Sequence, residues 1–185
     1  MAKKLFIIPA LLIAVIGVFA FSMMAAPGMD NPDSISIEYN SNVCKTVTRA
    51  DGTVEATECN HNLLYDTGKE LIELYLGNGS SGNADWIGLC NATSACGEPV
   101  ADSSEAYTAL TGGLSRTQGE YSSVDGSDGN WTISNKFTAT GSVSTNVTHL
   151  ETSAGVEFAG NSFTLVSLEN DDELSIEWNI WVSAP

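Results

Sequence analysis

The apolar stretch from Leu5 to Ala26 constrains this chain more than any other part of it. It contains 22 residues, LFIIPALLIAVIGVFAFSMMAA, none of which is charged, and Ser22 is its one polar side chain. A helix rises about 1.5 Å per residue, so this run would extend for roughly 33 Å, enough to cross a hydrocarbon core of about 30 Å. Residues 1–27 are therefore predicted to form an apolar helix, which lies either in a membrane or in the core of a filament.

The residues that flank this stretch indicate its orientation. Lys3 and Lys4 precede it, which places the N-terminus inside and the remainder of the chain outside the membrane. A cleaved secretory signal is the alternative, because Ala20-Phe21-Ser22 offers small residues at a possible cleavage site. The length of the apolar run favours a retained helix.

The remainder of the chain has the opposite chemistry. After a linker at residues 28–33, residues 34–185 are long enough for one domain with a core of its own. Beyond Lys4 the chain has 23 acidic residues and five basic ones, a net charge of −18. Such a surface repels phosphates and anionic lipid headgroups, so nucleic acid is excluded as a partner. Lipid contact is expected only through Leu5–Ala26.

One hairpin is predicted in detail by the segment VCKTVTRADGTVEATEC. Asp51-Gly52 is a strong signal for a two-residue turn between antiparallel strands. With the turn at that position, Cys44 lies opposite Cys59, Lys45 opposite Glu58 and Val47 opposite Ala56. Facing Cα atoms lie within the range of a disulfide. We therefore predict a Cys44–Cys59 disulfide.

The other two cysteines, Cys90 and Cys96, close the short loop CNATSAC and pair by elimination. Two disulfides indicate an oxidising compartment, and with the apolar segment they predict an extracellular domain at a cell surface or on an enveloped virion. A zinc site is the rival interpretation, but the sequence lacks the C-x-x-C spacing that is typical of one.

The domain is predicted to be an antiparallel β-sandwich of about eight to nine strands with one short helix at residues 66–77. Thr67 and Glu70 form a capping box at the start of that helix. The final strand has the clearest alternation, with Leu174, Ile176, Trp178, Ile180 and Val182 on the inward face. Residues 142–150 are polar on both faces.

Three residues are candidates for contacts between subunits. Ile35 and Ile37 lie on a first strand that is expected at an edge of its sheet, where a second chain can pair. Trp181 points away from the core face of the last strand. It is covered either by another element of the domain or by a neighbouring subunit.

Short motifs recur in a fixed order across residues 43–182. They are His61-Asn62-Leu63, Thr67-Gly68, Ile87-Gly88-Leu89, Gly119-x-Tyr121, Phe137-Thr138-Ala139-Thr140, Phe163 and Asp172-x-Leu174-x-Ile176-x-Trp178. Their order resembles β-sandwich modules of tailed-phage and archaeal-virus virions, which implies a structural or decorating role. Lys3-Lys4 followed by a long apolar helix resembles archaeal type IV pilins, although Lys4 stands where those leaders have a small residue.

The search for chemistry gives few candidates, and no catalytic motif is present. His61 and His149 are far apart in the sequence, which is typical of surface or hydrogen-bonded structural histidines rather than a catalytic pair. We expect no cofactor. Calcium is the one candidate ion, at the acidic turns that contain Asp125, Asp128, Asp171 and Asp172, although such turns are also common without a metal. Sequons for N-glycosylation occur at Asn78, Asn91, Asn130 and Asn146.

The sequence therefore predicts a non-enzymatic structural subunit that is exposed outside a membrane. Its expected partners are copies of itself, on a virion or in a cell-surface filament. The alternative is an adhesin or receptor-binding module that recognises glycans or a host surface protein.

Overall fold

The structure is a computed structural model that describes residues 38–77, 82–92, 96, 99, 110–124, 126 and 129–183. Within these residues, ten strands form two five-stranded sheets, with one helix. The predicted antiparallel sandwich is confirmed for this part, with ten strands where eight or nine were expected. The predicted anchor, Leu5–Ala26, lies outside the described residues.

In chain order the elements are β1 (Glu38–Thr48), β2 (Glu58–His61), β3 (Leu63–Leu64), α2 (Asp66–Gly77), β4 (Ala84–Cys90), β5 (Thr117–Gln118), β6 (Glu120–Ser123), β7 (Asn130–Thr138), β8 (Val143–Thr152), β9 (Glu157–Leu168) and β10 (Glu173–Ser183).

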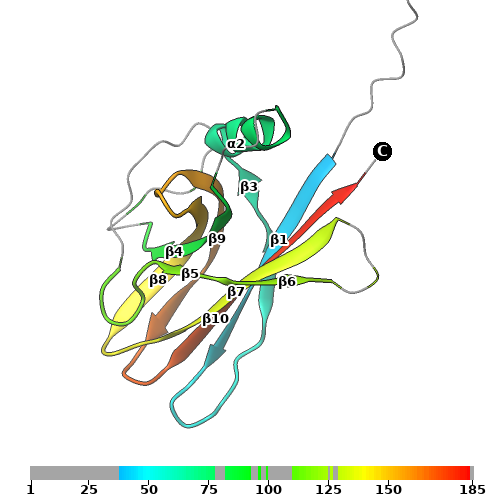
Figure 1. Ribbon diagram of the computed structural model, residues 1–185. Coiled ribbons are helices and arrows are strands. Elements are labelled where there is room, and N and C mark those ends of the chain that lie inside the picture. The colour runs from blue at the N-terminus through cyan, green and yellow to red at the C-terminus, as the bar shows by residue number, and fades with distance from the viewer. Residues whose placement is uncertain are drawn as a thin grey trace, which may run out of the picture. The chain divides into compact units, whose positions relative to one another are not determined.

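The two sheets have the strand orders β2-β1-β10-β7-β6 and β3-β9-β8-β4-β5, and all their pairings are antiparallel. Strand β1 pairs with β10 along its whole length, from Glu38 opposite Ser183 to Thr48 opposite Glu173. The start of β1 and the end of β10 consequently lie at the same end of the first sheet (Figure 1).

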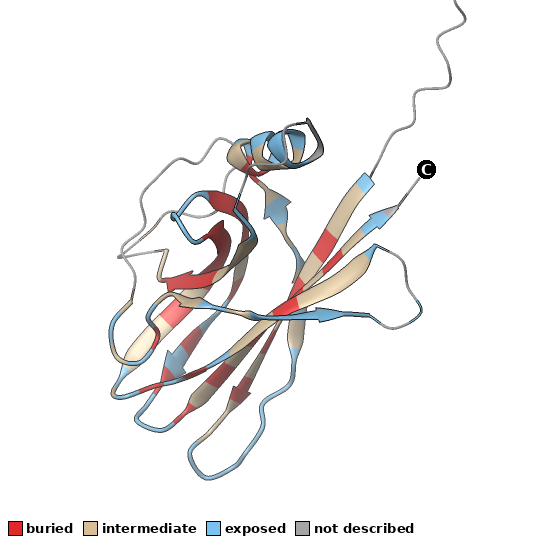
Figure 2. Cartoon of the chain, viewed as in Figure 1, coloured by how far each residue is buried: buried red, intermediate tan, exposed pale blue. Residues whose placement is uncertain are grey.

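The core lies between the facing surfaces of the two sheets, where the buried positions recur along the strands (Figure 2). In β10, Leu174, Ile176, Trp178 and Ile180 are buried, as their alternation predicted. Val182 was expected on the same inward face but is 37% exposed. The strand therefore runs out of the packed core at its last residues.

Strand β8 contains most of residues 142–150, the segment whose sequence is polar on both faces. All six residues from Val147 to Thr152 are buried, because β8 is an inner strand between β9 and β4. Two of its buried threonines are hydrogen-bonded to the backbone of β4: the Thr148 hydroxyl donates to the Gly88 carbonyl at 3.0 Å, and the Thr145 hydroxyl donates to the Cys90 carbonyl at 2.7 Å. Buried threonines are tolerated when they are hydrogen-bonded in this way.

The register predicted for the first hairpin is confirmed at its disulfide. Cys44 lies opposite Cys59 and is bonded to it, and Lys45 lies opposite Glu58. The Lys45 Nζ lies 3.2 Å from the Glu58 carboxylate. This side chain is buried against the ring of Phe163 in the other sheet, with Nζ 5.5 Å from the ring centroid, so the pair also ties the hairpin to β9.

The turn of this hairpin differs from the prediction. Gly52 has a φ of +85°, and its N–H donates to the Arg49 carbonyl at 2.8 Å. This geometry is that of a type I turn followed by a left-handed glycine, which closes a three-residue loop. Val47 was expected opposite Ala56, yet its carbonyl accepts a hydrogen bond from the N–H of Glu55. The pairing of the two strands therefore shifts by one residue between the turn and the disulfide.

Helix α2 has the predicted bounds, Asp66–Gly77, but its start is held differently. The expected capping box begins at Thr67, whose hydroxyl instead donates to the Glu157 carbonyl of β9 at 2.6 Å. At Gly68 the helix comes so close to β9 that a Cβ would lie 2.1 Å from the Phe158 carbonyl oxygen. Tertiary contact with β9, rather than a local cap, therefore fixes the first turn.

We expect that replacing Cys44 by Ser lowers the free energy of unfolding by about 3 kcal/mol, because its disulfide closes a loop with a sequence separation of 15. Replacing Cys90 by Ser removes a loop constraint with a separation of only 6, which predicts a loss of about 2 kcal/mol. Chemical denaturation measures both values. An unchanged midpoint for Cys44→Ser would contradict the assigned role of this bond.

Candidate functional site

An apolar groove opens at the end of the sandwich where β1 begins and β10 ends. It has a volume of about 660 Å³, which lies within the range of about 300–1,000 Å³ typical of ligand pockets. Among the described residues that line it, Asp85 is the one carboxylate, and no basic side chain is present. The large apolar lining residues are Tyr39, Leu71, Ile72, Tyr75, Tyr121, Trp131, Ile133, Leu150, Phe158, Ile180 and Val182.

The groove exists because helix α2 covers this end only in part. Leu71 and Ile72 are half-buried and pack against the core, whereas Tyr75, one turn further, is 50% exposed. On the other side, all four residues of the short strand β6 are exposed, and Tyr121 is 63% exposed. Apolar side chains of both sheets therefore line an opening that the helix does not close.

Sequence reasoning missed this groove. Its lining comes from eight elements, and each residue looks like an ordinary core or surface residue within its own segment. Exposed tyrosines on the helix and on an edge strand, Tyr75 and Tyr121, are the one local signal that could have indicated it.

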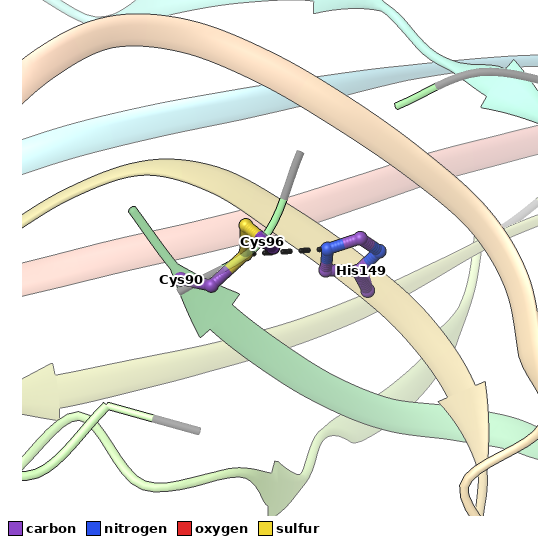
Figure 3. A group of neighbouring side chains, drawn as sticks. All are labelled: Cys90, Cys96 and His149. Carbon is purple, nitrogen blue, oxygen red and sulfur yellow. Dashed lines mark hydrogen bonds between the residues drawn. A yellow bond between two sulfur atoms is a disulfide. The ribbon is translucent and has the colours of Figure 1, made fainter. Parts of the chain in front are cut away.

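A buried polar cluster surrounds His149, which is 3% exposed. Its Nε2 lies 3.3 Å from the Cys90 sulfur, and its Nδ1 lies 3.1 Å from the Tyr65 hydroxyl (Figure 3 shows the ring beside the disulfide). A disulfide sulfur has no hydrogen, so Nε2–H is the donor and Nδ1 accepts from Tyr65. The interpretation of His149 as a hydrogen-bonded structural residue is confirmed, and His61 is exposed.

Burial lowers the pKa of His149 to about 4, so the ring is neutral at pH 7. The Glu157 carboxylate lies 3.8 Å from Nδ1, but a neutral imidazole makes no ion pair with it. Burial also raises the pKa of Tyr65. The Tyr65 hydroxyl packs against Gly160, where a Cβ would lie 1.9 Å from it, so this position admits only glycine. The cluster is thus a closed part of the interior.

The same region contains ligand atoms that could hold a metal: those of Cys90, Cys96 and His149 lie within 4.8 Å of one another. Cysteine binds metals as a thiolate, however, and these two sulfurs are bonded to each other. Cys44 and Cys59 form the other disulfide, in the first sheet. The four cysteines therefore form two separate disulfides, as predicted, and not the rival zinc site.

We expect the neutral, buried His149 to make the fold sensitive to acid. Its pKa in the folded state lies below the ordinary value of 6.5, so the unfolded state binds more protons between pH 6.5 and pH 4. The contribution of the neutral ring to the free energy of unfolding is fully present above pH 6.5 and decreases by about 3 kcal/mol as the pH falls to 4. Chemical denaturation across this range should show that the free energy of unfolding depends less steeply on pH in the His149→Gln variant than in the parent. An identical slope in the variant would contradict the assignment.

The calcium prediction is not supported at Asp172, although Asp125 and Asp128 lie outside the described residues. The Asp172 carboxylate accepts hydrogen bonds from the N–H groups of Glu169, at 3.0 Å, and Ala50, at 2.9 Å, and from the Arg49 guanidinium at 2.7 Å. Its hydrogen bonds with Glu169, and then those with Arg49 and Ala50, lower the pKa of Asp172. This side chain joins two hairpin turns. Asp171 is exposed, with a φ of 68°.

Three of the four sequons lie in the described part, and Asn78 does not. Asn130 is half-buried at the start of β7. The Asn91 side-chain amide donates to the Ser144 carbonyl at 3.4 Å, and the Asn146 side-chain carbonyl accepts from the Ala92 N–H at 2.8 Å. Asn91 and Asn146 therefore connect the end of β4 to β8.

Of the proposed subunit contacts, Trp181 is half-buried in β10, opposite Asn40 of β1 and Asn130 of β7. Ile35 and Ile37 lie outside the described residues. The first described strand, β1, is not an edge strand, because it pairs with β2 and β10.

Within the part of the chain that the structure describes, no helix has the length and hydropathy needed to cross a membrane. Comparison with known proteins adds no relative: no protein-family model, curated protein or solved structure matches this chain.

Proposed function

We propose that the chain is a non-enzymatic structural subunit, exposed outside a membrane, that assembles with copies of itself on a virion or in a cell-surface filament. The observation that carries this proposal is the apolar groove of about 660 Å³ at the end of the sandwich where β1 begins. An apolar opening of this size in an otherwise acidic domain favours association with another apolar surface.

The cysteines support the location. Both pairs are disulfides, which indicates an oxidising compartment. The outward-facing Cys59 is exposed, so its bond with Cys44 lies where a reducing environment would reach it.

The position of the polar groups supports a non-enzymatic role. His149 of β8, Glu157 of β9 and Tyr65, between β3 and α2, are buried and are not part of the groove lining. Among the described residues that line the groove, Asp85 is the one carboxylate and Asn83 the one side-chain amide. Glycan recognition needs many directed polar contacts, so this lining suits an apolar protein segment better than a sugar.

We expect assembly to depend on the apolar segment. A charge in the middle of an apolar helix costs about 3 kcal/mol, so Val15→Asp should abolish regular assemblies. Sedimentation and electron microscopy of the full chain, produced in an oxidising compartment, measure this. Val54→Asp, at a position that is 61% exposed on the first hairpin, introduces the same charge and should assemble like the parent.

A parent chain that stays monomeric at high concentration would overturn the proposal. So would normal assembly of the Val15→Asp variant.

A further inference from the structure

We infer that the apolar groove binds the apolar segment Leu5–Ala26 of a second copy of this chain. The inference rests on the proposed self-assembly and names the contact that produces it.

The groove and the segment match in polarity. Aromatic and aliphatic side chains dominate the groove lining, and Asp85 is the one carboxylate among the described residues that line it. The segment contains 22 residues without a charge. The segment is therefore the part of the chain whose chemistry suits this opening.

Charge complementarity favours the same contact. Beyond Lys4 the chain has 23 acidic residues and five basic ones. Among the described residues that line the groove, none is basic. Lys3 and Lys4 directly precede the apolar segment and are its nearest charges on that side. A segment in the groove would bring these two positive charges close to a domain in which acidic residues far outnumber basic ones.

The chain between the segment and β1 is long enough to reach a neighbour. Eleven residues, Pro27–Ile37, separate Ala26 from Glu38. They span at most about 36–40 Å when extended. Pro27 and Pro32 favour an extended linker. A linker of this length allows the segment to reach the groove of a neighbouring copy.

Burial of the whole apolar helix also requires more than one copy of the chain. A helix that is apolar on all sides must be buried on all sides. One groove covers one face of such a helix, so its other faces need further segments or grooves. Because groove and segment are different surfaces, the contact is heterologous and propagates into a filament or closes into a ring.

Cross-linking between two differently tagged chains tests this contact. One chain carries an added cysteine in the groove, Val182→Cys or Tyr121→Cys. The other carries one in the segment, Ala14→Cys or Ile16→Cys, two positions that point to opposite sides of a helix. A short bismaleimide added to the mixed, assembled full chains can join these residues only between copies. The matched control places the groove cysteine at the exposed Val54.

We expect at least about tenfold more heterodimer with the groove variants than with Val54→Cys, and a preference for one of the two segment positions. Equal yields at Val54 and in the groove would overturn the inference. A chain that carries both cysteines and cross-links only within itself would also overturn it, since its own segment would then be the occupant.

Two further outcomes separate this inference from the proposed function. Assemblies that form without groove cross-links would overturn the contact and leave self-assembly intact, whereas an absence of assemblies would overturn both. Protection of Val182→Cys from a water-soluble maleimide only in phosphatidylcholine vesicles, without cross-links, would identify lipid as the occupant and overturn the inference.

Discussion

The antiparallel pairing of β1 with β10 is the interaction on which the rest of the described structure depends. It places Val43 opposite Trp178 and Val47 opposite Leu174, and all four side chains are buried. Every other strand of the first sheet is added outside this pair, with β2 beyond β1 and β7 beyond β10. The pairing also brings Tyr39 and Val182 to the same end of the sheet, where both line the groove. The core and the candidate site therefore share one structural cause.

Sequence periodicity predicted the strands that have one face in the core and one toward solvent. Strand β10 is the clearest case, because alternate residues from Leu174 to Ile180 are buried. The same reasoning fails for β8, which is covered on both faces, so burial does not follow polarity there. Burial of Thr145 and Thr148 is tolerated because their hydroxyls donate to carbonyl groups of β4, and that depends on a pairing far apart in the sequence.

The disulfide between Cys44 and Cys59 was predictable because one hairpin contains both residues. The contact between Cys90 and His149 was not, because it joins residues 59 positions apart and requires β4 to lie beside β8. The groove depends on contacts among many more segments of the chain, since its lining comes from eight elements. Local patterns thus predicted the fold class and one bond, whereas the candidate site follows only from the arrangement of the sheets.

The acidic surface gives a physical reason why the proposed contact through the groove would be selective. Two domains of residues 34–185, each with 21 acidic and five basic residues and so a net charge of −16, repel each other over about 10 Å at 0.1 M salt, the Debye length under those conditions. The apolar segment, with Lys3 and Lys4 before it, experiences no such repulsion near the same surface. Contacts between two domains are therefore disfavoured relative to contacts between a domain and a segment. The uneven distribution of charge along the chain would in this way direct heterologous assembly, with the sandwiches kept apart and the segments joining them.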